Sequence, residues 1–157
     1  ALVHNPELLI LDEPTVGLDP QARYLIWQRL KTLKEEGVTM MLTSHYMDEV
    51  ARLSDRVMIL DHGQVIVEGE PGALVTELVG LDVFEVVCSE EEAVSLKKIA
   101  RQCGARSEIM PEGIFLYTSK NCSALDDQVR PLQRWLRRPA NLEDLFIQLT
   151  GRSLQEA

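Results

Sequence analysis

LLILDEPTVGLDP, residues 8–20, carries the strongest indication of how the chain folds. Its first four residues are apolar and run directly into the pair Asp12-Glu13, which is typical of a strand covered on both faces in a parallel sheet. Asp19 and Pro20 then favour the start of a helix, because an Asp side chain accepts hydrogen bonds from free helical N–H groups and Pro fits the first turn. A buried strand followed by a helix predicts an α/β fold.

The same alternation continues through the first half of the chain. A second apolar strand is expected over residues 38–44, and a short helix over 46–53. Residues 56–60 and 64–69 indicate two strands joined by DHG, the composition of a tight hairpin turn. Strand, helix, strand and helix therefore lead into a β-hairpin.

The charge distribution and Gly80 indicate a second domain. Residues 1–80 hold 6 Lys+Arg against 13 Asp+Glu, a net charge of −7, whereas residues 81–157 hold 10 against 12, a net charge of −2. A short helix beginning near Pro71 ends before Gly80, which is a plausible boundary residue. We therefore expect two domains, one at 1–80 and one at 81–157.

The second domain is expected to be small and α+β. It opens with an alternating strand over 82–88, and Ser89 stands three residues before Glu92, the spacing of a capping box at a helix start. Two further strands are expected around 106–110 and 113–118, on either side of the turn PEG.

The end of the second domain is predicted to be helical. Apolar residues repeat at helical spacing through 123–138, although Pro131 lies inside the segment at a cost of about 3 kcal/mol if the helix is continuous. We expect a kink or a restarted helix there. A last helix with Asn141 as its cap completes the order β-α-β-β-α-α.

The overall composition excludes several classes of protein. A chain of 157 residues with 45% hydrophobic content can bury a core, and its net charge of −9 argues against a nucleic-acid partner. No apolar run reaches the roughly 18 residues of a membrane span, so we expect a cytoplasmic protein. Three cysteines at wide spacing, without a CxxC pair, indicate buried or idle thiols rather than a zinc site or a disulfide framework.

Polar side chains follow both strands predicted for the parallel sheet. The first strand ends at Asp12-Glu13, and the second ends at Thr43, Ser44 and His45. Functional groups of open α/β sheets collect at the carboxyl ends of the strands. A carboxylate there suits Mg2+, which takes one or two carboxylates beside waters and phosphates, and a second carboxylate can orient and deprotonate a water.

These residues resemble the motifs of the ATP-binding-cassette (ABC) ATPases. LLILDEP is similar to their Walker B motif, GLDP to their D-loop and TSH to their switch-histidine loop, in the family's order, and SDRVMILDHGQVIVEG resembles the hairpin that closes the domain. The resemblance implies the C-terminal half of a P-loop ABC ATPase domain, followed by a small α+β accessory domain.

The resemblance also implies roles for individual residues. Asp12 is expected to hold Mg2+, Glu13 to be the catalytic base and His45 to contact the γ-phosphate of ATP. Asp19 is expected to act in the D-loop, which couples the two nucleotide-binding domains of a dimer. The other implied partner is an integral-membrane permease, which holds the ATPase at the inner face of the cell membrane.

The tail RRPANLEDLFIQLTGR resembles the C-terminal segment of ABC-2-type exporter ATPases, and DPQARYLIWQRL favours their nodulation-factor branch. One departure is that residues 136–141 leave little room for a strand expected before the final helix. A helix in this segment could carry four arginines on one face: Arg130, Arg134, Arg137 and Arg138. Such a face could contact an anionic membrane surface or partner, but we favour a solvated face whose arginines pair with nearby acids.

The sequence does not contain the family's phosphate-binding loop GxxxxGK[ST], its glutamine loop or its LSGGQ-like signature. We therefore expect an ATPase parent, but an isolated chain that does not hydrolyse ATP and that self-associates through an uncovered sheet. The alternatives are a non-catalytic dimerisation or regulatory module, and a soluble ABC protein of DNA repair or translation, which the exporter-like tail disfavours.

Overall fold

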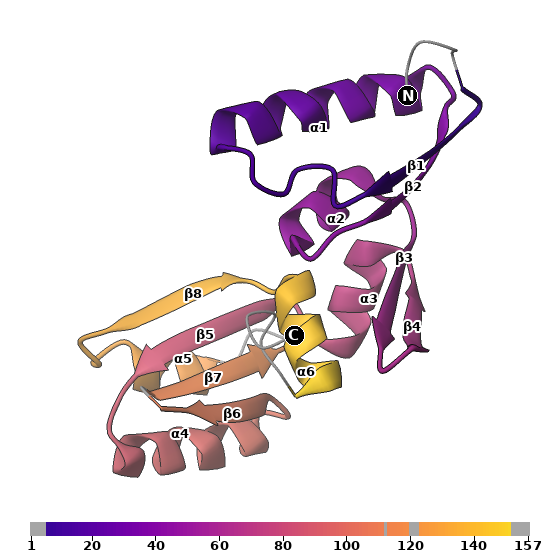
Figure 1. Ribbon diagram of the computed structural model, residues 1–157. Coiled ribbons are helices and arrows are strands. Elements are labelled where there is room, and N and C mark those ends of the chain that lie inside the picture. Colours follow the sequence, from indigo (N-terminus) through magenta and orange to yellow (C-terminus); the bar gives the residue numbers. More distant parts are fainter. Residues whose placement is uncertain (1–5, 112, 120–122, 152–157) are drawn as a thin grey trace. The chain divides into compact units, whose positions relative to one another are not determined.

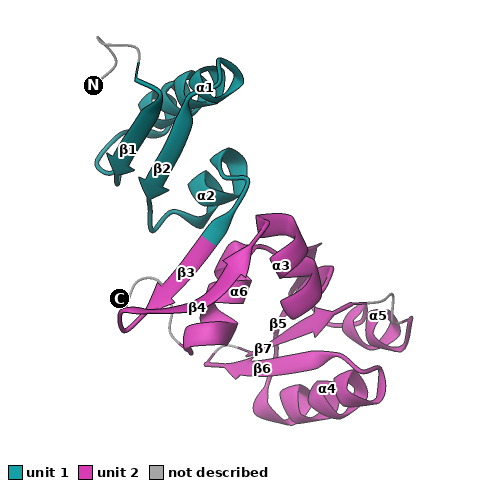
Figure 2. Cartoon of the chain, turned by 90° about the vertical axis from the view of Figure 1, so that its right-hand side faces the viewer, with its two compact units in different colours: residues 1–57 teal, residues 58–157 magenta. Residues whose placement is uncertain are grey.

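The computed structural model describes residues 6–111, 113–119 and 123–151. Its contacts divide the chain into two compact units, residues 1–57 and residues 58–157 (Figure 2). The predicted fold class is confirmed, because the first unit is an α/β pair of parallel strands and the second combines a hairpin with an antiparallel sheet and helices.

Unit 1 contains the two parallel strands that the sequence predicts. Strand β1 (Leu8–Asp12) pairs with β2 (Thr39–Thr43) in register, so that the last residues of the two strands stand opposite each other. The helix α1 (Pro20–Glu35) connects the strands and covers one face of their sheet, and α2 (Met47–Leu53) follows β2 (Figure 1). The core of this unit consists of Leu9, Leu30, Leu33 and Leu53.

The other face of this sheet is uncovered within the described residues. Leu8, Ile10 and Met41 are 57%, 70% and 64% exposed, and they alternate with the buried side of the strands. The prediction that the first strand is covered on both faces is therefore wrong for this chain, whereas the expectation of an uncovered apolar face is met.

Except for Val57, unit 2 contains the hairpin formed by β3 (Val57–Asp61) and β4 (Gln64–Gly69), whose turn has His62 and Gly63 at positive φ. Two consecutive residues of this conformation match the right-handed twist of a tight hairpin. The helix α3 (Pro71–Leu78) follows. The contacts group this hairpin with the later residues in unit 2. However, β3 and β4 form a two-stranded sheet that is separate from the four-stranded sheet of the same unit. We therefore propose that the domain boundary lies near Gly80.

The rest of unit 2 is a four-stranded antiparallel sheet in the order β6-β7-β5-β8. Its strands are β5 (Asp82–Val87), β6 (Arg106–Met110), β7 (Gly113–Thr118) and β8 (Trp135–Pro139), and its helices are α4 (Glu90–Gln102), α5 (Ser123–Val129) and α6 (Leu142–Thr150). The helices α4 and α5 pack on one face of this sheet, through a core that includes Phe84, Leu96, Ile114 and Leu125. The predicted capping box of α4 and the predicted Asn141 cap of α6 are both present, and the α6 cap is itself a capping box with Asp144.

The prediction of a helix over residues 123–138 is wrong in its second half. The helix α5 ends at Val129, before Pro131, and residues 135–139 form the edge strand β8. Proline cannot donate the helical hydrogen bond, and the open side of β5 offers ladder partners to the residues that follow. The element order of residues 82–150 is therefore β-α-β-β-α-β-α, and the strand expected before the final helix is present.

Two further expectations about side chains need correction. Cys103 is disulfide-bonded rather than an idle thiol, while Cys88 is free and Cys122 lies outside the described residues. Arg137 and Arg138 stand on a strand, not on a helical face, and both pair with acids: Arg137 with Asp82, and Arg138 with Glu85. The pairing with acids agrees with the interpretation we favoured.

Candidate functional site

The parallel register of β1 and β2 brings the polar strand ends together. Asp12 stands opposite Thr43, and the backbone N–H of Glu13 continues the ladder by donating to the carbonyl oxygen of Thr43 at 3.1 Å. The predicted site residues Asp12, Glu13 and His45 thereby lie at one edge of one small sheet.

The Thr43 hydroxyl connects the two carboxylate residues. Its Oγ1 donates to Oδ1 of Asp12 at 2.5 Å and accepts from the backbone N–H of Glu13 at 3.2 Å. Sequence reasoning placed Thr43 at the strand end but assigned no role to it. The signal that could have identified it is a hydroxyl residue facing a strand-terminal Asp across a parallel pair.

Glu13 has an unusual backbone conformation and a direct contact with His45. Its φ of 46° lies in the left-handed region, which costs of order 1–3 kcal/mol for a residue other than glycine and clusters at functional sites. The Glu13 carboxylate Oε2 lies 3.0 Å from Nδ1 of His45 and 3.4 Å from the backbone nitrogen of the same residue. Their side chains are 36% and 50% exposed, so the pair is reachable from solvent.

A stack of side chains supports His45 from the side. The ring of Tyr46 lies 4.2 Å from the ring of His45, and the guanidinium carbon of Arg23 lies 4.2 Å from the centre of the Tyr46 ring. Arg23 is the fourth residue of α1. Sequence reasoning missed both partners, because helix periodicity does not show which polar side chain turns towards a loop.

Asp19 is engaged in the helix cap that the sequence predicts. Its Oδ1 accepts hydrogen bonds from the backbone nitrogens of Gln21 and Ala22, each at 2.9 Å. Among the described residues, no hydrogen bond or ion pair joins the Asp19 side chain to Asp12, Glu13 or His45. The predicted role of Asp19 between subunits stays a prediction.

A buried carboxylate holds α2 against α1. Glu49 is fully buried, and its Oε1 accepts a hydrogen bond from the indole nitrogen of Trp27 at 2.8 Å. Its Oε2 has no hydrogen-bond partner among the described residues. Since α2 begins two residues after His45, this contact fixes the helix that follows the site.

The donor set at the strand ends suits a weakly protein-bound ion. No group of three His, Cys, Asp or Glu side chains that could hold a metal occurs in the described part of the chain. The Thr43 hydroxyl binds one carboxylate oxygen of Asp12, and the second carboxylate oxygen of Asp12 remains for an ion. Mg2+ fits such a site, because it keeps several waters and takes its remaining ligands from substrate phosphates.

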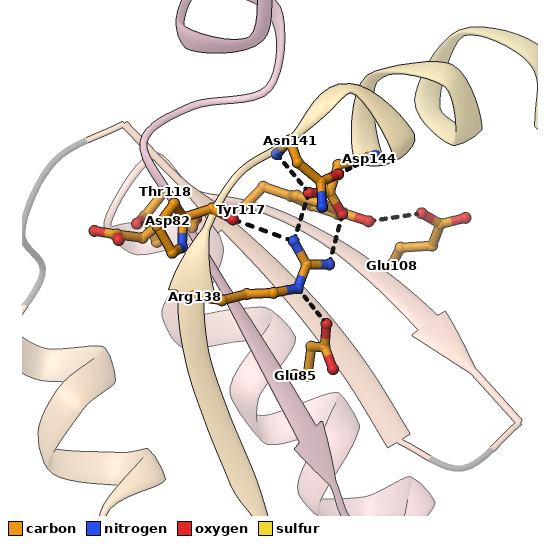
Figure 3. Close-up of polar contacts among 9 residues, drawn as sticks. Asp82, Glu85, Glu108, Tyr117, Thr118, Arg138, Asn141 and Asp144 are labelled. Carbon is orange, nitrogen blue, oxygen red and sulfur yellow. Dashed lines mark hydrogen bonds and ion pairs between the residues drawn. The ribbon is translucent and has the colours of Figure 1, made fainter. Parts of the chain in front are cut away.

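A second polar cluster lies in unit 2 and has a structural explanation (Figure 3). Arg138 binds Asp144 through both terminal nitrogens, at 2.7 and 2.8 Å, and Glu85 through Nε at 2.5 Å. The hydrogen bonds to Asp144 raise the pKa of Arg138, and burial raises the pKa of the nearby Tyr117 phenol. The cluster ties the first turn of α6 to the strands β5 and β8.

None of the helices among the described residues is long and apolar enough to span a membrane.

Comparisons with known proteins agree with the motifs. Residues 91–151 match the family model described as the C-terminal domain of the nodulation factor export protein NodI. A Nod factor export ATP-binding protein I from Sinorhizobium fredii is 45% identical, covering 99% of this chain and 45% of that protein, and one from Rhizobium leguminosarum bv. viciae is also 45% identical, with 50% of that protein covered. The chain spans about half the length of the curated relatives it matches.

The solved structures include cbiO1 from Clostridium perfringens, whose title describes it as part of the ABC transporter complex cbiONQ. It is 40% identical in sequence, and the match covers 46% of this chain and 29% of that chain with a TM-score of 0.41. The sequence relatives cover the first unit and the second alike, since the alignments include 99% of the chain. By sequence, therefore, the whole chain is similar to the Nod factor export ATP-binding proteins, and residues 91–151 match the C-terminal domain of NodI.

Proposed function

We propose that the chain forms part of the ATP-binding subunit of an ABC exporter, which couples ATP binding and hydrolysis to transport through a membrane permease. The proposal rests above all on the contacts among Asp12, Thr43, Glu13 and His45 at the carboxyl ends of two parallel strands, where open α/β sheets bind ligands. The names of the relatives, which are Nod factor export ATP-binding proteins, support it.

Asp12 and Glu13 divide the chemistry between them. Asp12 holds Mg2+, an ion that neutralises charge on the transferring phosphate when it is bound. Glu13 orients the attacking water and accepts its proton, a role typically worth about 10²- to 10⁴-fold in rate. The Glu13 side chain is suited to this because it is partly exposed and has His45 as a fixed neighbour.

His45 links the base to the phosphate. A carboxylate can only accept hydrogen bonds, so Nδ1 of His45 carries the proton when it binds Oε2 of Glu13. The remaining nitrogen, Nε2, then donates to a phosphate oxygen only when the ring is doubly protonated. Hydrogen bonding of His45 to both groups therefore requires the imidazolium form.

The 157 residues do not by themselves form a complete ATP site. The sequence contains no GxxxxGK[ST] loop, which supplies several charge-assisted hydrogen bonds to the phosphates. At about 1.5–3 kcal/mol each, three such bonds contribute about 5–9 kcal/mol, or three to six decades of affinity. The isolated chain is therefore expected to bind ATP weakly and not to hydrolyse it.

The proposed partners are a permease and a second nucleotide-binding domain, with Asp19 in the loop between the two domains. The permease would hold the subunit at the inner face of the membrane. In the isolated chain the uncovered apolar face of β1 and β2, formed by Leu8, Ile10 and Met41, favours self-association instead.

Calorimetric titration with Mg-ATP tests this proposal. The full-length subunit that carries this chain should bind with micromolar affinity, and the 157-residue chain should show no binding at the same concentrations. Micromolar binding by the isolated chain would overturn the expectation of an incomplete site. Absence of binding by the full-length subunit would overturn the proposed function.

A further inference from the structure

We propose that Thr43 is a positioning residue of the ATPase site, whose hydroxyl fixes the orientation of the Asp12 carboxylate and the backbone of Glu13 at the same time. The inference rests on the proposed function, since Asp12 and Glu13 are the groups to be positioned. It adds a fourth residue to the two carboxylates and the histidine at these strand ends.

The hydrogen-bond capacity of a hydroxyl defines the arrangement. Thr43 has one proton to donate, and it donates it to Oδ1 of Asp12 at 2.5 Å. Its oxygen then accepts from the backbone N–H of Glu13 at 3.2 Å. One Asp12 oxygen is thus held by the protein, which leaves the other for an ion and sets the rotamer in which it is presented.

Glu13 needs such support because of its backbone. Its φ of 46° is a conformation that residues other than glycine adopt only where the surroundings impose it. The same N–H also donates to the carbonyl oxygen of Thr43 at 3.1 Å, so both oxygens of Thr43 hold the residue after the strand. In this conformation the Glu13 carboxylate lies 3.0 Å from His45.

The neighbouring hydroxyl does not duplicate this contact. Oγ of Ser44 accepts from the backbone nitrogen of Tyr46 at 3.0 Å, at the start of α2. Thr39 lies on the same face of β2 as Thr43, at the opposite end of the strand and opposite Leu8. Thr39 therefore provides a matched control for the same substitution on the same strand.

The first test uses the 157-residue chain and needs no nucleotide. Thr43→Val keeps the shape and the β-branching but removes the hydroxyl. Amide hydrogen exchange by NMR should then show the Glu13 N–H exchanging about two- to tenfold faster, because it loses one of its two acceptors and keeps the carbonyl oxygen of Thr43. Thr43→Ser should restore the wild-type rate, and Thr39→Val should leave it unchanged. An unchanged Glu13 rate in Thr43→Val would overturn the inference. If that variant does not fold, Thr43→Ala compared with Thr43→Ser takes its place under the same criteria.

The second test uses the full-length subunit that carries the chain. Thr43→Val should raise the Mg2+ concentration for half-maximal ATP hydrolysis and lower kcat, each about tenfold, with the KM for ATP within about twofold of wild type. Thr43→Ser should rescue both. If Glu13→Gln abolishes hydrolysis while Thr43→Val behaves like Thr39→Val, the positioning role fails alone. If Glu13→Gln leaves hydrolysis intact, the proposed function fails.

Discussion

The cluster around Asp144 allows a stability prediction for unit 2 to be worked out from the structure. Asp144 is 2% exposed, and its carboxylate accepts hydrogen bonds from both terminal nitrogens of Arg138 and from the backbone nitrogen of Asn141 at 2.9 Å. Asp144→Asn keeps the size of the side chain but removes the charge and one of the two acceptor oxygens. The Arg138 guanidinium then loses its main partner.

The expected loss is moderate, because Arg138 keeps a second carboxylate. Removing one partner of a buried ion pair costs about 3–5 kcal/mol. Arg138 still binds Glu85, and their side chains are 25% and 32% exposed, so we expect a smaller loss of about 2–3 kcal/mol. For a protein of this length that corresponds to a decrease in Tm of about 4–12 °C.

Urea denaturation followed by circular dichroism measures this loss as a shift of the midpoint at constant slope. Glu143→Gln is the matched control, because Glu143 is exposed in the same turn of α6. It should change the free energy of unfolding by no more than about 0.5 kcal/mol. If Asp144→Asn proves as mild as Glu143→Gln, the cluster does not stabilise α6 in the way described.

Three further predictions concern other parts of the chain. Trp27→Phe removes the indole N–H that donates a hydrogen bond to Oε1 of Glu49, and it should lower the free energy of unfolding of unit 1 by about 1–3 kcal/mol in chemical denaturation. Wild-type stability of this variant would contradict a role for the contact. Ile10→Lys should abolish concentration-dependent self-association in light scattering, whereas unchanged association would place the contact elsewhere. The hydrogen bonds from Ser89 lower the pKa of Glu92. The capping box of α4 therefore stabilises the fold at pH values above the ordinary carboxyl pKa near 4.5, and this stabilisation is lost as the pH falls through the lowered pKa. Glu92→Gln should remove that part of the acid sensitivity in melts between pH 6 and about pH 3; identical profiles would refute the linkage.

The sequence was most informative where local chemistry and topology agree. The strand at Leu8–Asp12 and the cap at Asp19 follow from an apolar run and from the chemistry of helix ends, and the structure contains both. The position of Asp12 opposite Thr43, at the end of the second strand, follows from the parallel pairing of the two strands alone. The capping boxes at Ser89 and Asn141 are likewise set by short-range spacing.

Features that depend on distant partners could not be predicted in this way. Residues 135–139 follow a helix-like pattern, yet they form a strand because β5 has an open edge that the sequence does not display. The hydroxyl of Thr43 gains its contacts only through register. The burial of Glu49 depends on the indole nitrogen of Trp27 on another helix.

Glu13 offers the sharpest test of the proposed site. ATP hydrolysis by the full-length subunit should be measured with Glu13→Gln and with Glu35→Gln, which changes an exposed residue at the end of α1 in the same chemical way. We predict that Glu13→Gln lowers kcat by about 10²- to 10⁴-fold, while Glu35→Gln retains the wild-type rate. Hydrolysis at the wild-type rate in Glu13→Gln would contradict the assignment of these strand ends as the catalytic part of an ATPase.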